Sequence, residues 1–174
     1  MRSAPKNFLC TSSNNGPLVC EAMEDDFYVE QHMVNATSGA HFFTTDGTVD
    51  SEGNLVVTFD EAGVGQTTVK YNLTANVFAT YGCLNKGGKN PCASNKQTTS
   101  AASSATATFN PKNGRIVGTI IMAPIPPAAT FKCPSGQKFV LASVSYTDIV
   151  LTDQTNNVVT STGDVARNFF PLCK

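Results

Sequence analysis

Residues 67–82, TTVKYNLTANVFATYG, constrain the fold more than any other segment of the chain. Their odd-numbered positions from Val69 to Tyr81 are all apolar or aromatic, whereas the even-numbered positions are mostly polar. Successive side chains of a β-strand point to opposite faces of the sheet, so this alternation predicts one strand with a buried side and a solvent-facing side. The strand exceeds the usual length of about five or six residues. We therefore predict that the β-structure is built around it.

Shorter strand patterns, separated by turn signals, follow one another from His41 to the end of the chain. The turn residues 50–53 and an Asn-Gly pair at 113–114 each predict a hairpin between the strands that flank them. Prolines within residues 124–127 predict an extended crossing between two sheets. Besides the long strand, the predicted strands are residues 41–49, 54–59, 100–109, 115–122, 129–133, 138–153, 158–162 and 166–173. Eight or nine strands at this spacing predict an all-β fold, an antiparallel β-sandwich stapled by disulfides.

Two segments depart from this regular pattern. Residues 138–153 shift their alternation by one position near Thr147 and Asp148, which predicts a β-bulge there. Residues 1–40 form an acidic extension, irregular or with a short helix over 21–34, although a strand is an equal alternative for part of that segment. We predict two parts, an extension over 1–40 that packs on the body and a β-sandwich over 41–174.

Six cysteines and two glycosylation sequons point to an oxidising compartment. None of the cysteines forms a CxxC pair and the chain has only two histidines, which disfavours a zinc site and favours three disulfides. Sequons at Asn35 and Asn72 agree with this compartment. No apolar run approaches the roughly 20 residues of a membrane-spanning helix, so we predict a secreted glycoprotein whose leader has been removed. The cysteines are Cys10, Cys20, Cys83, Cys92, Cys133 and Cys173.

The charge is distributed unevenly along the chain, although the net charge is only −1. Residues 1–66 carry ten acidic and two basic residues, a net charge of −8. Residues 67–174 carry ten basic and three acidic residues, a net charge of +7. The favoured interpretation is that the two halves pack together within one molecule. The alternatives are a basic face for an anionic partner and self-association, with the acidic half of one copy against the basic half of the next.

Three segments resemble small secreted β-sandwich proteins of unknown function from actinobacteria. They are GQTTVKYNLTANVFATYGCLNKGGKNP, FKCPSGQKFVLASVSYTDIVLTD and the terminal RNFFP, within residues 65–171. The resemblance implies a disulfide between Cys83 and Cys133 and carries no activity with it. The remaining cysteines then have three pairings, of which Cys10 with Cys20 is the most local. From the residues alone all 15 connectivities remain open, and Cys83 with Cys92 is the obvious rival.

Enzymatic motifs are missing from the sequence. The serine nucleophile elbow, the dinucleotide-binding and phosphate-binding glycine motifs and the HExxH zinc motif do not occur. A small hydrolase would have to use His32 or His41 as its base. Six cysteines joined in three disulfides would leave no free thiol as a nucleophile. Contiguous carboxylates and the absence of Trp do not favour a glycosidase. An enzyme is therefore the second choice.

Two groups of charged residues are candidate binding sites. Acids in neighbouring hairpin segments could supply the several oxygen ligands of a calcium ion, although acids at β-turns commonly only form the turn. They are Asp46, Asp50, Glu52, Asp60 and Glu61. Three lysines in the loop after the long strand, Lys86, Lys89 and Lys96, could contact an anionic partner. They lack the interleaved aromatic residues of a nucleic-acid surface, so we predict no nucleic-acid partner.

The functional prediction follows from a rigid scaffold without catalytic motifs. We expect a secreted, non-enzymatic binding or structural module with no cofactor other than a possible calcium ion. Such a module would recognise a protein or a glycan through its loops or a sheet face. Phe78 stands among the polar positions of the long strand and is a candidate contact on that face, although the commoner arrangement covers both faces of a strand near such a residue.

Overall fold

The computed structural model describes residues 8–11, 19–22, 39–85, 87 and 96–170, the first two ranges by their backbone alone. The chain divides into two compact units, Met1–Val34 and Asn35–Lys174. In the first unit, β1 (Phe8–Thr11) pairs antiparallel with β2 (Val19–Ala22), and their register sets Cys10 opposite Cys20. Residues 21 and 22, where the predicted helix would begin, belong to β2, and its remainder over 23–34 lies outside the described residues. The packing of the extension on the body lies outside them as well.

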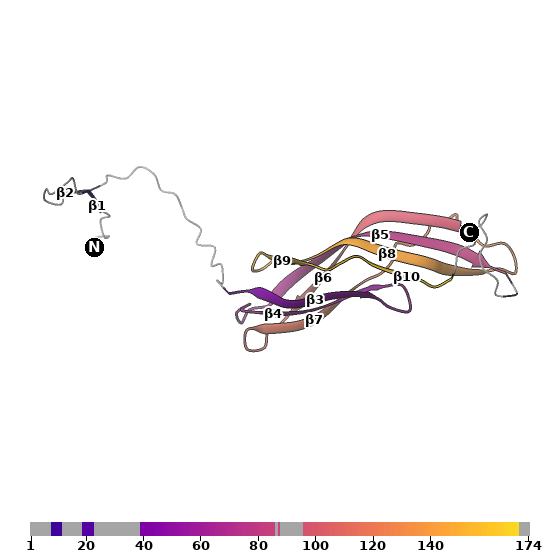
Figure 1. Ribbon diagram of the computed structural model, residues 1–174, viewed down its shortest axis with the longest axis horizontal. Helices are drawn as coiled ribbons and strands as arrows, with labels where there is room; N and C mark the ends of the chain where they lie inside the picture. The colour runs from indigo at the N-terminus through magenta and orange to yellow at the C-terminus, as the bar shows by residue number, and fades with distance from the viewer. Residues whose placement is uncertain (1–7, 12–18, 23–38, 86, 88–95, 171–174) are drawn as a thin grey trace. The chain divides into compact units, whose positions relative to one another are not determined.

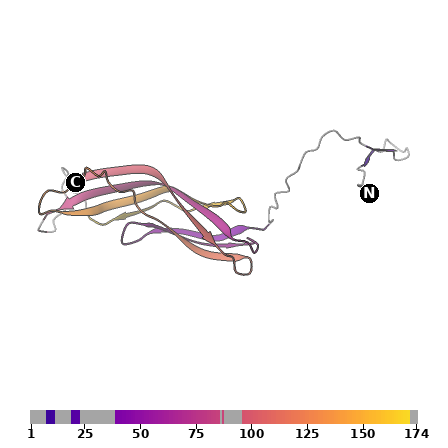
Figure 2. The ribbon, with the colours of Figure 1, turned by 180° about the vertical axis from the view of Figure 1, so that it is seen from behind.

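The second unit consists of two antiparallel sheets packed together, as Figures 1 and 2 show from opposite sides. The larger sheet has the order β10-β8-β5-β6, with β9 also paired to β8, and the smaller has the order β3-β4-β7. The strands are β3 (His41–Val49), β4 (Leu55–Ala62), β5 (Val69–Leu84), β6 (Lys96–Phe109), β7 (Arg115–Met122), β8 (Lys138–Asp153), β9 (Val158–Ser161) and β10 (Val165–Asn168). This confirms the predicted β-sandwich, with eight strands in this unit. The described residues include no helix long and apolar enough to cross a membrane.

Strand β5 lies at the centre of the larger sheet, as its alternation predicted. It pairs with β6 along one edge and with β8 along the other. Its odd-numbered side chains from Val69 to Tyr81 are buried between the sheets, whereas its even-numbered side chains form part of the outer face. Each large apolar side chain buried in this way stabilises the fold by about 1.5–3 kcal/mol.

Aromatic rings from both sheets meet in the core. Phe59 of β4 packs on Tyr71 of β5 with ring centroids 4.6 Å apart, and Phe109 of β6 meets both rings edge-on. Phe42 of β3 completes the cluster. Gly118 of β7 provides the space for it, because a Cβ atom at that position would lie 2.6 Å from the Phe59 ring. Phe59, on the inward side of β4, therefore brings the smaller sheet into contact with the aromatic rings of the larger one.

Two predictions about strand pairing are wrong. The Asn113-Gly114 pair does form a tight turn, with both residues at positive φ and Lys112 and Arg115 bonded across it. However, β6 and β7 do not pair as a hairpin, because they belong to different sheets. Residues 129–133 form no strand and belong to the irregular connection between β7 and β8. The prolines at 124–127 lie in this connection, which crosses from the smaller sheet to the larger one as predicted.

The bulge predicted in β8 is present. The register between β5 and β8 shifts between Thr74 and Asn76, opposite residues 147–150 of β8. Asp148 sits in this irregularity with φ at 51°, in the left-handed region that Asp and Asn tolerate better than most residues. At the bulge, two residues of β8 lie opposite one residue of β5, so the regular rows of side chains across the larger sheet are interrupted there.

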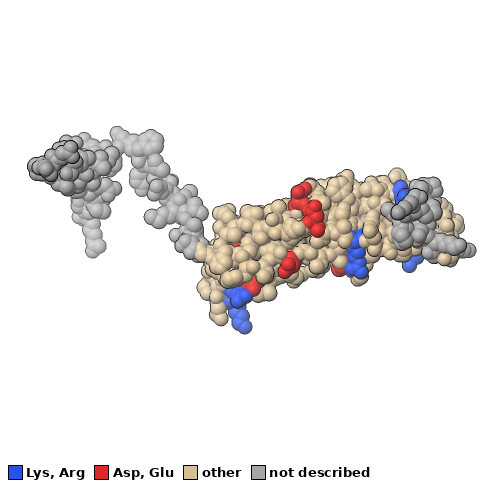
Figure 3. Space-filling view, in the orientation of Figure 1, with Lys and Arg blue, Asp and Glu red and all other residues tan. Residues whose placement is uncertain are grey.

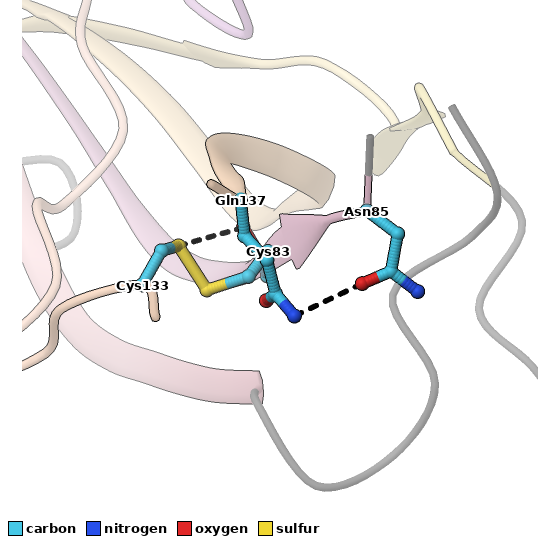
Figure 4. Close-up of a disulfide and its surroundings, with 5 residues drawn as sticks. Cys83, Asn85, Cys133 and Gln137 are labelled. Carbon is cyan, nitrogen blue, oxygen red and sulfur yellow. Dashed lines mark hydrogen bonds between the residues drawn. A yellow bond between two sulfur atoms is a disulfide. The ribbon is translucent and has the colours of Figure 1, made fainter. Parts of the chain in front are cut away.

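The disulfide implied by the resemblance, Cys83–Cys133, is confirmed. It joins the end of β5 to the connection before β8, with the two Cα atoms 5.5 Å apart. Figure 4 shows the bridge beside a hydrogen bond of 2.9 Å from Gln137 to Asn85. Both interactions hold the same end of the larger sheet, the end at which β5 stops at Leu84. Cys92 and Cys173 lie outside the described residues.

Candidate functional site

The outer face of the larger sheet is rich in hydroxyl and amide groups. Registers between neighbouring strands align these side chains in rows across three strands. The outward positions are Lys70, Asn72, Thr74, Asn76, Phe78 and Thr80 on β5, Thr98, Ser100, Ala102, Ser104, Thr106 and Thr108 on β6, and Ser143, Ser145, Thr147, Val150 and Thr152 on β8. Such a face offers many hydrogen-bond donors and acceptors with little charge.

A hollow of about 390 Å³ opens in the middle of this face. It lies over β5, between small side chains of β6 on one side and the bulge of β8 on the other, since Ala102 lies opposite Asn76 and Ser104 lies opposite Thr74. Asp148 closes the third side. The hollow thus depends on strand register as much as on side-chain size.

Two polar groups in the hollow are held in place by a hydrogen bond. Nδ2 of Asn76 donates to Oδ2 of Asp148 over 2.8 Å, and the backbone N–H of Asp148 donates to Oδ1 of Asp164 over 3.2 Å. Nothing in the described part of the chain donates to the second carboxylate oxygen of Asp148 or bonds to the side-chain oxygen of Asn76. The fixed pair therefore keeps two side-chain oxygens without a hydrogen-bond partner among the described residues.

Phe78 lies beside the hollow, two residues beyond Asn76 on the same face of β5. Its flanking residues are Ser100 and Ser145, which are too small to cover its ring, and 45% of the side chain is exposed. The sequence pattern placed Phe78 on the polar face, and the structure confirms that position. An exposed ring next to fixed polar groups provides a flat apolar platform for a ligand.

Charge is scarce around this site. Among the outward positions of β5, β6 and β8 in the rows from Asn72 to Thr80, only Asp148 in the bulge is charged. Lys70 lies at the end of the face, opposite Thr108. In Figure 3 most of the described surface in view is uncharged, with charged side chains in separate patches. The hollow is therefore a weakly acidic site in a neutral surface.

The five acids predicted to bind calcium lie in different surroundings. Asp60 pairs with Arg115, whose hydrogen bond lowers the pKa of Asp60, and a side-chain hydrogen bond from Asn54 lowers the pKa of Asp50 in the β3–β4 turn. Asp46 and Glu52 are exposed, and Glu61 is buried. In the described ranges no three His, Cys, Asp or Glu side chains gather closely enough to hold a metal ion.

Glu61 forms an acidic site of a different kind. It points from β4 across the core, where the hydroxyl of Tyr71 donates to its Oε2 over 2.7 Å. The pKa of Glu61 is raised to about 7, mainly by burial; the hydrogen bond from Tyr71 opposes the rise and the neighbouring carboxyl of Asp153 adds to it. Its other oxygen, Oε1, has no hydrogen-bond partner among the described residues. Both carboxyls are fully buried, so this pair joins the two sheets and is closed to a substrate.

The other predicted site residues are not brought together. His41 is exposed at the start of β3, where its Nδ1 bonds to the Gly39 carbonyl, while His32 lies outside the described residues. Lys96 is half-buried at the start of β6, and Lys86 and Lys89 lie outside the described residues.

One of the two sequons is placed by the structure. Asn72 is half-buried on the outer face, between Thr106 and Thr152. The other sequon, at Asn35, lies outside the described residues.

Sequence analysis did not identify Asp148 and Asn76 as site residues. The signal for Asp148 was present, because the change of alternation near Thr147 marks a bulge, and bulges often adjoin functional sites. No local signal pairs Asp148 with Asn76, since 72 positions separate them. A signal for Glu61 also existed: it continues the odd-numbered, inward series of Leu55, Val57 and Phe59.

Comparisons with known proteins do not suggest a function for this site. No protein-family model, no curated protein and no solved structure matches the chain.

Proposed function

We propose that the protein is a secreted, non-enzymatic binding module that recognises a glycan with the outer face of its larger sheet. The contact site comprises the hollow, the Asn76–Asp148 pair and the ring of Phe78. One observation carries the proposal: a hydrogen-bonded amide–carboxylate pair opens into a hollow next to an exposed aromatic ring. Sugars combine hydroxyl groups with apolar C–H surfaces, and this combination of groups is complementary to both.

The composition of the face favours a glycan over a protein partner. Protein interfaces are built around clustered apolar anchors that become fully buried. On the outer rows around the hollow, Phe78 is the one large aromatic side chain, and its neighbours are hydroxyl and amide groups. These groups can exchange bonds with water for bonds with sugar hydroxyls at little desolvation cost.

Secretion is part of the same proposal. The Cys83–Cys133 disulfide supports it, because such bonds persist mainly in oxidising compartments. The sequon at Asn35 is a second, sequence-based support; Asn72 also stands in a sequon, but it lies on the outer face in the row next to Thr74, so we expect that site to carry no glycan. Peptide mapping of the protein secreted by its native cells would test both the bridge and the glycans.

Binding to insoluble polysaccharides and to a glycan array tests the proposed function. We expect Phe78→Ala to weaken binding about tenfold or more, because aromatic contacts at binding sites commonly contribute over 1 kcal/mol. Phe43→Ala is the matched control: Phe43 is 59% exposed, but it lies on the smaller sheet beside His41 and Arg115. Equal losses in the two variants, or no reproducible binding by the wild type, would reject the proposal.

A further inference from the structure

We propose that the hollow selects a sugar unit with a free amine, so that the module prefers a cationic glycan to its neutral and anionic analogues. This inference rests on the proposed function and adds the class of ligand. The charge of the hollow, its hydrogen-bonding groups and its aromatic neighbour each favour an amine.

The charge of the hollow is negative and uncompensated. Asp148 is its only charged lining residue, and Asp164 brings a second carboxylate to the backbone of the same bulge. Within the described ranges the one ion pair is that of Arg115 with Asp60 on the smaller sheet, so no cation neutralises either carboxylate. An anionic sugar would meet repulsion here, whereas a protonated amine would meet attraction.

The unused hydrogen-bonding groups suit a donor. An ammonium group has three donors and no acceptor. The hollow presents free acceptors on the second oxygen of Asp148 and the side-chain oxygen of Asn76, with the hydroxyl oxygens of Thr74 and Ser104 on its wall. A neutral hydroxyl could satisfy only one of these acceptors as a donor. The amine can therefore satisfy more of the site than a hydroxyl at the same position.

Phe78 adds a second preference for positive charge. Its exposed ring lies on the same face, one outward position from Asn76. The face of an aromatic ring attracts cations, at exposed sites as well as buried ones. Because the hollow is open to solvent, salt screens the Asp148 contribution, and the preference for an amine should fall as ionic strength rises.

The test compares three oligomers of equal length and linkage: β-1,4-linked glucosamine, its N-acetylated form and the corresponding glucose oligomer. Binding is measured by calorimetry at mildly acidic pH and low salt, where the amines are protonated. We expect the wild type to bind the glucosamine oligomer several-fold, up to about tenfold, more tightly than the other two. Asp148→Asn should remove this preference while keeping the bulge, because Asn tolerates positive φ. Asp46→Asn, at an exposed acid of β3, should retain it.

The possible results separate the inference from the proposed function. Equal affinity for the three oligomers, or an amine preference that survives in Asp148→Asn, would overturn the amine selectivity and leave glycan binding in place. Weaker binding of all three oligomers by Phe78→Ala, together with loss of the amine preference in Asp148→Asn, would support both. Absence of binding to any of the oligomers by the wild type would overturn the inference, and the polysaccharide panel then decides separately on the proposed function.

Discussion

Asp148 and Asp153 lie five residues apart on β8 and occupy opposite environments. Asp153 is fully buried, and its carboxylate accepts the backbone N–H groups of Thr155 and Asn156 and the side-chain amide of Asn156. Asp148 is exposed in the bulge, with one carboxylate oxygen bonded to Asn76 and the other without a partner among the described residues. One strand thus provides a buried acid at the sheet interface and an exposed acid on the outer face, to which we have assigned a role in recognition.

The difference follows from what surrounds each carboxylate. At the interface Asp153 is beside Glu61, and burial together with this neighbouring carboxyl raises the pKa of Glu61. On the outer face, the groups around Asp148 are small and polar, and solvent reaches them. The unbonded oxygen of Asp148 is next to solvent and is available to a ligand. The oxygens of Asp153 are buried and bonded within the protein, which gives Asp153 a structural role.

The largest expected effect is on stability at the interface. Asp153→Ala removes the acceptor for three donors of the β8–β9 turn, and we expect a loss of about 3–4 kcal/mol in the free energy of unfolding. Asp148→Asn, five residues away, should change the same quantity by less than about 0.5 kcal/mol. Urea titrations of both variants measure the two free energies of unfolding. Similar losses in the two variants would contradict the different roles of Asp148 and Asp153.

A smaller effect concerns the pH dependence of stability. The folded protein holds the Glu61 proton more tightly than the unfolded chain, because the pKa of Glu61 is raised from 4.5 to about 7. The free energy of unfolding should therefore fall by up to about 3 kcal/mol as the pH rises from about 4.5 to about 7, and this contribution should stay constant above that.

The matched variant for this pH dependence is Glu61→Gln. It keeps an acceptor for Tyr71 and offers an amide donor to Asp153 without a titrating proton, so we expect a flatter profile over the same range. Asp148→Asn should leave the profile as it is in the wild type. A wild-type profile that does not fall across this range would contradict the assignment of the proton to Glu61.

Local alternation predicted the fold well, because a strand with one buried face leaves a period of two in its sequence. It placed β5 and β8, the orientation of Phe78 and the bulge at Asp148. It did not predict that β6 and β7 enter different sheets, since a turn sequence specifies a local reversal and not the partner of the next strand. Residues 129–133 have a suitable composition but no neighbouring strand to pair with.

The candidate site was less predictable than the fold. The hollow results from the register of three strands that are far apart in sequence, and no single segment contains it. Grouping Glu61 with surface acids overlooked its inward position on β4, where packing and not turn formation decides its environment. Sequence reasoning therefore recovers elements whose pattern is local, and loses sites that arise from the assembly of sheets.

Chemical-shift mapping by NMR tests the central claim, that the outer face of the larger sheet is the recognition surface. Backbone amides of the isotopically labelled protein would be followed during titration with a glycan that binds in the array. We expect the largest shifts at Asn76, Phe78, Ala102 and Asp148, and little change along β3, β4 and β7. Shifts concentrated on the smaller sheet, with the outer rows of β5, β6 and β8 unchanged, would contradict the claim.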